Sequence, residues 1–215
     1  MSFLACLPLI ESDIPAVLDL DQRCLGGLWT SSGYQRELDS PHSDLLVLLS
    51  ADSPALLQHR QHPFLSASPS PASPSLPFSL IGVGCLWAIL EEAHIITLAI
   101  DPDHQGQKLG QLLLSQLLLC GYKRGLTRAT LEVRASNQPA LNLYQKFAFK
   151  AAGIRKRYYS DGENACILWR SGLQSEAVVR QVTQWQAEAI AQLNAHQIQI
   201  MPLLPFSAHT DIPVN

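Results

Sequence analysis

The stretch Asp101–Leu114, DPDHQGQKLGQLLL, follows an apolar run typical of a strand and opens a leucine-rich run typical of a helix. The N–H groups in the first turn of a helix have no partner within the helix, and the helix dipole adds partial positive charge to them. A strand, a short loop and a helix in this order therefore form a site for phosphate oxygens. Gly106 and Gly110 let the main chain approach an anion closely.

The stretch differs from two common nucleotide-binding loops. No G-K-[ST] sequence follows its glycines, and the three glycines of the dinucleotide fingerprint are missing. Taken alone, the segment is equally well explained as an ordinary connection between a strand and a helix.

The composition favours one α/β domain with a sizeable core. The chain has 215 residues, of which 47% are hydrophobic and only 15% charged, with a net charge of −3. Such a balance argues against binding along a nucleic-acid backbone. The five cysteines form no C-x-x-C pair or Cys/His cluster, so we expect no metal, and scattered thiols fit a reducing cytoplasm. The first residues make a poor signal peptide, and no apolar run reaches the roughly 20 residues of a membrane helix.

Hydrophobic periodicity and turn residues predict the order β-α-α-β-β-β-α-β-α-β, a mixed α/β domain. Strands are expected within 4–10, 44–50, 80–90, 91–102 and 128–135, and in a hairpin over 152–170. Helices are expected within 11–25, 30–41, 104–125 and 137–149.

Two segments stand apart from this pattern. Residues 52–79 are rich in Pro and Ser, which predicts a flexible insertion between two strands of a domain that spans residues 1–170. Apolar residues recur every three or four positions over 171–196, which predicts an amphipathic helix that packs on the domain or on another copy of it. Residues 171–215 would thus form a C-terminal helix and a loose tail.

Three later motifs occur in order after the loop, namely LEVRASN at 131–137, ALNLY at 140–144 and RKRYY at 155–159. With the loop, they resemble the GNAT superfamily of acetyl-CoA-dependent N-acetyltransferases, and within it the ribosomal-protein alanine N-acetyltransferases of bacteria (the RimI type). The resemblance covers roughly Leu7 to Trp169, without the insertion. It implies a GNAT fold, in which helices flank a mixed, mostly antiparallel central sheet.

The resemblance implies acetyl-CoA as co-substrate. The superfamily loop has the form Q/R-x-x-G-x-G/A and grips the pyrophosphate of coenzyme A, while the pantetheine arm lies along the preceding strand. The matching residues are Leu98, Ala99, Ile100, Gln105, Gly106, Gln107, Lys108, Leu109, Gly110, Gln111 and Asn137. Lys108 replaces the middle glycine, which reduces room or access to positive φ, so we expect weaker binding rather than none. Asn137 is equally explained as a helix cap.

The resemblance assigns Glu132 as general base and Tyr144 as general acid. An α-amino group has a pKa of about 8, so one carboxylate, directly or through water, can complete its deprotonation. From the residues alone, a solvated strand carboxylate or a pair with Arg134 explains Glu132 as well, and ring packing explains Tyr144. The RKRYY run is open to three interpretations: substrate contact, a solvated hairpin or RNA contact. Trp29 and Tyr34 are expected to line the same groove.

The function that the sequence favours is a cytoplasmic enzyme that acetylates the N-terminal amine of a protein, a ribosomal one beginning with alanine, by direct transfer in a ternary complex. We expect neither nucleic acid nor membrane as a partner. Two alternatives stay open: acetylation of lysine side chains or small amines, and a non-catalytic CoA-binding scaffold domain.

Overall fold

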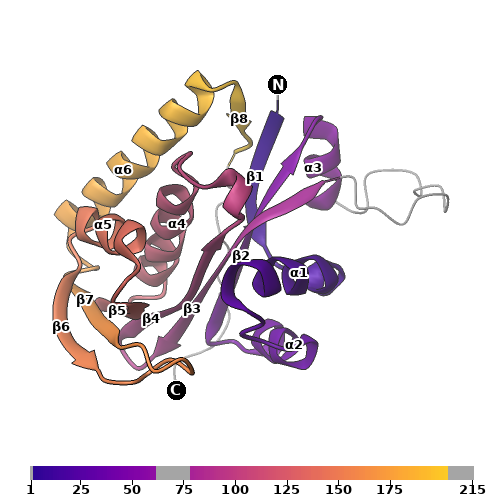
Figure 1. Cartoon of the computed structure of the whole chain (residues 1–215). Coiled ribbons are helices and arrows are strands. Elements are labelled where there is room, and N and C mark those ends of the chain that lie inside the picture. Colours follow the sequence, from indigo (N-terminus) through magenta and orange to yellow (C-terminus); the bar gives the residue numbers. More distant parts are fainter. Residues whose placement is uncertain (1, 62–77, 203–215) are drawn as a thin grey trace, which may run out of the picture.

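One mixed sheet organises the computed structural model, which describes residues 2–61 and 78–202. Its strand order is β6-β7-β5-β4-β3-β2-β1-β8 (Figure 1). Neighbouring strands are antiparallel except for β4 with β5 and β1 with β8, so the predicted mixed, mostly antiparallel sheet is confirmed. The strands are β1 Ser2–Pro8, β2 Ser43–Ala51, β3 Ser79–Ile89, β4 Glu92–Ile100, β5 Arg128–Arg134, β6 Lys150–Arg155, β7 Ala165–Ser171 and β8 Ile198–Ile200.

Helices cover both faces of the sheet (Figure 1). On one face lie α1 Ile14–Leu25, α2 Ser31–Asp39 and α3 Pro54–Gln61, and on the other lie α4 Leu109–Lys123, α5 Gln138–Lys146 and α6 Glu176–Ala195. Two short 3-10 turns, Glu11–Asp13 and Pro102–His104, precede α1 and α4. None of the helices in the described ranges is long and apolar enough to cross a membrane.

Strand side chains alternate between two apolar cores. In β1, Leu4 and Cys6 join the core beneath α4 and α6, while Ala5 and Leu7 join the core beneath α1 and α2. The buried residues of α4 form most of the first core, because its leucine-rich sequence is apolar around nearly the whole helix. α4 is therefore held between the sheet and α6.

Two parts of the sequence-based picture need correction. The flexible insertion predicted for 52–79 is wrong for Pro54–Gln61, which form α3, with Leu57 completely buried. Pro54 suits the first position of a helix, and the Pro/Ser-rich composition hid the apolar residues that follow it. Residues 62–77 lie outside the described residues. β8 was not predicted, because a three-residue strand is defined by its pairing with β1 rather than by its own pattern.

The predicted C-terminal helix forms as α6, and it packs against α4 of its own domain. Val182, Ala189 and Leu193 of α6 belong to the same core as α4. The close approach of α4 to the sheet on its other side depends on Gly84 of β3. A Cβ at this position would lie 3.0 Å from Leu117 and 3.2 Å from Leu113, both on α4.

Gly84→Ala is expected to lower the free energy of unfolding by about 1–3 kcal/mol, because the added methyl forces α4 away from β3. Gly153→Ala in β6 is the matched control, since its Cβ would meet Ile167 at an ordinary 3.7 Å. Urea denaturation measures both variants. A Gly84→Ala protein as stable as the control would show that α4 can shift without loss.

Candidate active site

The sheet opens between β4 and β5. The two strands pair in parallel only as far as Ile95 and Leu131. β4 then continues to Ile100 beside β3, whereas β5 continues to Arg134 beside β7. A gap therefore separates the C-terminal halves of two neighbouring strands.

A β-bulge in β4 marks the start of this gap. Leu86 of β3 pairs with Ile95 and Cys85 pairs with Thr97, so Ile96 has no counterpart. A bulge of this kind bends a strand and re-aims its side chains. The bulge therefore turns β4 away from β5 at the point where their pairing ends.

Beyond the bulge, main-chain groups of β4 face the gap. The Asp101 N–H donates to the Ile81 carbonyl of β3 at 2.9 Å. Residues of an antiparallel strand alternate between facing the neighbour and facing away from it. Ala99 therefore faces β3, while Leu98 turns its N–H and C=O groups toward the gap. Ile100 turns the same way, but its carbonyl accepts a hydrogen bond from the Gln105 side chain, which leaves its N–H for the gap. Of the three residues expected along the pantetheine arm, two thus present main-chain groups on the open side.

The loop after β4 leads directly into the first turn of α4. The Leu112 N–H donates to the Lys108 carbonyl at 3.0 Å, which closes that turn. The N–H groups of Leu109, Gly110 and Gln111 precede this bond and have no helix carbonyl to bind. With the helix dipole, they form the donor set that suits phosphate oxygens.

Lys108 adopts the backbone conformation that a glycine would favour. It is the N-cap of α4, with φ 67° and ψ 7°, and Gly106 is left-handed as well, with φ 76°. A residue with a Cβ loses about 1–2 kcal/mol in this conformation. Position 108 therefore keeps a positive φ although it carries a lysine, and this conformation strains the backbone. The Lys108 side chain is exposed.

Asp101 anchors the start of the loop between β4 and α4. This buried carboxylate accepts hydrogen bonds from Arg23 of α1, from the Asp103 N–H at 2.9 Å and from the His104 ring at 3.4 Å. Burial alone would raise the pKa of the Asp101 carboxyl, but the hydrogen bonds from Arg23 and the Asp103 N–H outweigh it and lower this pKa. An ionised carboxylate thus ties the loop to α1.

The other predicted cofactor residues of the loop have distinct positions. The Gln105 side chain donates to the last carbonyl of β4 at 3.0 Å. Gln107 is exposed, whereas the Leu109 side chain is buried in the core and leaves only its main chain for a ligand. A Cβ on Gly110 would lie 3.4 Å from Leu143, so the glycine lets α5 approach the first turn of α4 closely.

Glu132 lies on β5 immediately after the strands part. Leu131 and Val133 enter the core beneath α4, so Glu132 faces the other side of the sheet. Its Oε1 lies 3.1 Å from Nη2 of Arg155 at the end of β6. The Glu132 side chain is 23% exposed and that of Arg155 is 54% exposed. A partly buried carboxylate is therefore paired with a cation that solvent can reach.

Arg134 has other partners than Glu132. It binds Asp161 and Glu163, each at 2.7 Å, and its guanidinium lies 4.0 Å from the centroid of the Tyr159 ring. These contacts hold the β6–β7 loop against the end of β5. Burial raises the pKa of Tyr159 and the charge of Arg134 opposes this rise, while the negative charge of Glu132 makes a smaller contribution to it. Tyr159 is thus an electrostatic neighbour of the candidate base.

Tyr144 is buried on α5, where its ring packs edge-on against Phe149 at 5.7 Å between centroids. Burial, and after it the charge of Tyr159, raises the pKa of the Tyr144 phenol above its ordinary value near 10. The phenol is protonated at neutral pH, and the rise in its pKa makes it a weaker acid than an exposed tyrosine.

Asn137 caps α5. Its Oδ1 accepts a hydrogen bond from the Ala140 N–H at 3.1 Å, so the cap interpretation is confirmed. The cap uses the oxygen of the side-chain amide, and the nitrogen of the same amide remains a donor suited to a ligand.

Two features of this site were not predicted from the sequence. The RKRYY run was noted, but the partnership of Arg155 with Glu132 and the position of Tyr159 depend on the register of the β6–β7 hairpin. One predicted groove residue was wrong: Tyr34 is only 1% exposed and packs against Trp29 at 5.0 Å between ring centroids.

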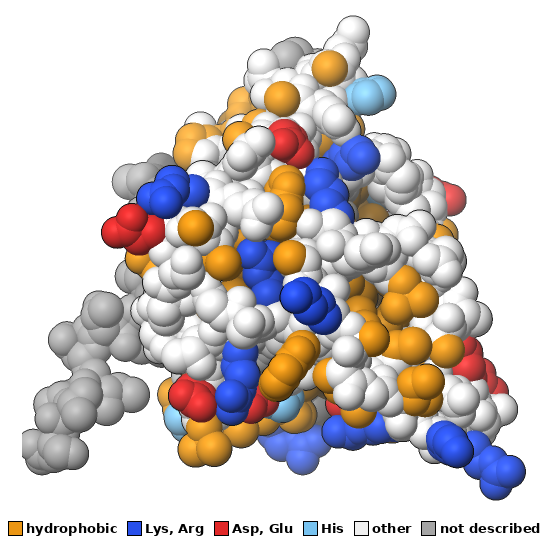
Figure 2. All heavy atoms as spheres, turned by 90° about the vertical axis from the view of Figure 1, so that its left-hand side faces the viewer, with side chains coloured by type: hydrophobic (Ala, Val, Ile, Leu, Met, Phe, Trp, Pro, Cys, Tyr) orange, Lys and Arg blue, Asp and Glu red, His pale blue; other side chains and the backbone are white. Residues whose placement is uncertain are grey.

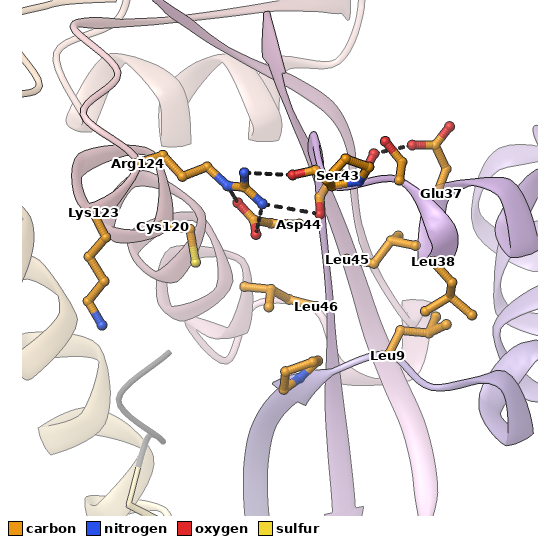
Figure 3. A pocket seen from close by; sticks show the side chains of 13 residues that line it. Leu9, Glu37, Leu38, Ser43, Asp44, Leu45, Leu46, Cys120, Lys123 and Arg124 are labelled. Carbon is orange, nitrogen blue, oxygen red and sulfur yellow. Dashed lines mark hydrogen bonds and ion pairs between the residues drawn. The ribbon is translucent and has the colours of Figure 1, made fainter. Parts of the chain in front are cut away.

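A separate cavity of about 180 Å³ lies at the other end of the sheet, between α2, the start of β2 and the end of α4 (Figure 3). Arg124 reaches across it and binds both carboxylate oxygens of Asp44, at 2.6 and 2.8 Å, while the Ser43 hydroxyl donates to Glu37. Burial raises the pKa of the Cys120 thiol in its wall to about 12, so this thiol is no nucleophile at neutral pH. The paired polar groups make this cavity a junction between elements.

The groups around the gap suit an extended anionic ligand better than a metal ion. A free strand edge leads to unpaired N–H donors at a helix N-terminus, a set that fits a chain ending in phosphates. No cluster of three or more His, Cys, Asp or Glu side chains able to hold a metal occurs within 2–61 and 78–202.

Comparison with known proteins points to the same chemistry. The model of the Acetyltransferase (GNAT) family matches residues 14–149. A protein of Bacillus subtilis (strain 168), for which [ribosomal protein bS18]-alanine N-acetyltransferase activity is proposed, is 31% identical over 159 residues, which cover 73% of this chain and 88% of that protein.

Solved structures share the fold. The ribosomal-protein-S18-alanine N-acetyltransferase from Escherichia coli is 27% identical, with a TM-score of 0.59 over 78% of this chain and 93% of that one. The PaiA N-acetyltransferase from Thermoplasma acidophilum, solved in complex with coenzyme A, has a TM-score of 0.55 at 14% identity and covers 78% of this chain and 98% of that one.

Lys108→Gly is expected to raise the free energy of unfolding by about 1 kcal/mol, because the relief of left-handed strain exceeds the entropy that glycine adds to the unfolded chain. Lys108→Ala is the control: it removes the ammonium group but keeps the Cβ, and should stay within about 0.5 kcal/mol of the parent. Urea denaturation separates the two, and equal stability of both variants would contradict the assignment of strain.

Proposed function

Because the chain belongs to the acetyltransferase (GNAT) family, we propose that it transfers an acetyl group from acetyl-CoA to the N-terminal α-amino group of a protein, a ribosomal protein that begins with alanine. The observation that carries this proposal is the gap between β4 and β5, which opens in front of the first turn of α4 and has Glu132 at its border. The activities named for the Bacillus subtilis and Escherichia coli relatives support an alanine amine as the acceptor. Such a substrate places the enzyme in the cytoplasm.

Acetyl-CoA supplies the acetyl group as an activated thioester. Leu109, Gly110 and Gln111 would bind its diphosphate through their N–H groups, with Gln105, Gly106, Gln107 and Lys108 shaping the loop around it. Leu98 and Ile100 would bond the pantetheine arm as an added strand, with Ala99 between them, and the side-chain nitrogen of Asn137 would donate to it. A main-chain N–H of β4 beside the bulge would polarise the thioester carbonyl.

Glu132 would act as the general base. An α-ammonium group with a pKa of about 8 needs to lose a single proton before it can attack, and a nearby carboxylate is sufficient for this step. The exposed Arg155 keeps the carboxylate paired until an amine arrives. Tyr144, protonated in its buried position, would donate a hydrogen bond or a proton to the departing sulfur.

The β6–β7 loop would form one wall of the acceptor groove. Tyr158 and Tyr159 stack edge-on, with 5.2 Å between ring centroids, and Arg155 lies 5.4 Å from the Tyr158 ring. These rings stand beside Glu132, where the first residue of a peptide would have to bind. Contact with substrate therefore accounts for the RKRYY run better than contact with RNA.

A peptide that starts with alanine and also contains an internal lysine tests the acceptor. Acetylation is expected on the α-amine alone, and the same peptide with a blocked N-terminus should give no product. Mass spectrometry of the product locates the acetyl group. Acetylation of the lysine, or of spermidine at a higher rate, would refute the proposed acceptor. Binding of acetyl-CoA without any turnover would support a scaffold domain instead.

Glu132→Gln is expected to lower kcat about 10²- to 10⁴-fold, because the amide accepts no proton from the amine. The dissociation constant of acetyl-CoA, measured by calorimetry, should change little. Glu92→Gln is the matched control, since Glu92 is also a partly buried strand carboxylate paired with an arginine, Arg128 at 2.7 Å. Similar rates for both variants would remove Glu132 from the mechanism.

A further inference from the structure

The C-terminal helix α6 lies outside the region matched by the family model, which ends at residue 149, yet it packs on α4, the helix proposed to bind the cofactor. It runs along the outer side of α4 and α5 (Figure 1). Lys and Arg side chains gather along the middle of the face that these helices form (Figure 2). One contact between α6 and α4 lies at the first turn of α4 rather than in its middle.

Gln111 makes this contact. It is the third residue of α4 and its side chain is only 4% exposed. Its Nε2 donates to the main-chain carbonyl of Trp185 in α6 at 2.6 Å, and its Oε1 accepts from Lys146 Nζ of α5 at 2.8 Å. Lys146 also reaches Glu188 of α6 at 3.3 Å. Both ends of one buried amide therefore join three helices.

Trp185, whose carbonyl accepts the hydrogen bond from Gln111, is itself held in place by packing. The Trp185 ring packs against Phe147 with 4.7 Å between centroids, and the Arg170 guanidinium lies 5.5 Å from the Trp185 ring. Arg170 also donates to the Phe147 carbonyl. α6 is thus fixed against the end of α5 at the level of Trp185.

We propose that Gln111 is a positioning residue, through which α6 keeps the first turn of α4 formed and its N–H groups aimed at the cofactor phosphates. The turn needs such support, because the left-handed Lys108 immediately before it stores strain, and a strained conformation persists only when its surroundings over-determine it. We call the two hydrogen bonds of the Gln111 side chain the tie. Without the tie, the turn would relieve this strain by fraying. The inference rests on the proposed function for the identity of the ligand, but the tie itself is independent of any ligand.

Gln111→Met tests the tie, since methionine has a similar shape and makes neither hydrogen bond. Gln116→Met is the matched control, because Gln116 is also 4% exposed and lies on the same helix, farther from the loop. Amide hydrogen exchange of Leu112–Leu114, measured without cofactor, should be about five- to tenfold faster in Gln111→Met than in the control. The dissociation constant of acetyl-CoA, measured by calorimetry, should rise by a similar factor.

Adding Lys108→Gly should shrink both effects of Gln111→Met, because the strain that drives fraying is then gone. Equal exchange in Gln111→Met and Gln116→Met would overturn the tie. Faster exchange with unchanged affinity would overturn its link to the cofactor. If the unaltered protein bound no acetyl-CoA, the proposed function would fail, while the exchange comparison would still decide on the tie.

Discussion

The bulge at Ile96 is the constraint on which the rest of the structure depends. Before it, Ala93 and Ile95 point into the core beneath α4, and after it Leu98 and Ile100 pack against that same core. The extra residue thus resets the alternation of the strand, so that β4 can part from β5 and still bury an apolar side. Full pairing of the two strands would leave neither a slot for an acyl carrier nor main-chain donors to line it.

The gap is useful only if the loop that follows it is rigid, and this loop is held from both faces of the sheet. Asp101 ties its start to Arg23 of α1 on one side, and Gln111 ties its end to α6 on the other. Lys108 stands between these two anchors in a conformation that an isolated chain would avoid. Donors that are fixed before a ligand arrives bind it without a further loss of conformational entropy. The substitution of a family glycine is therefore tolerable here because the neighbours on each side restrain the turn.

Local signals predicted most of the fold, and long-range contacts account for the misses. The cap at Asn137 could be predicted because it depends on a few adjacent residues. α3 was missed because the composition around Leu57 resembles that of a linker, and β8 because only its pairing with β1 defines it. Motifs singled out the loop and Glu132 as candidates. The pairing of Glu132 with Arg155 was not predicted, because β7 lies between their strands and a turn of unknown register joins β6 to β7.

Glu132 and Tyr144 have different environments, which suit the different roles proposed for them. Tyr144 lies in an apolar core that keeps its phenol protonated, while Glu132 borders solvent beside a cation. A partly buried carboxylate that lost its cation would be destabilised, so the substrate amine has to arrive as Arg155 leaves. In the proposed reaction, the arriving α-ammonium group replaces the exposed guanidinium, and the carboxylate exchanges one cation for another. The ammonium group then passes one proton to Glu132, and the neutral amine that remains attacks the thioester, so that the pair of charges disappears just before the new amide bond forms.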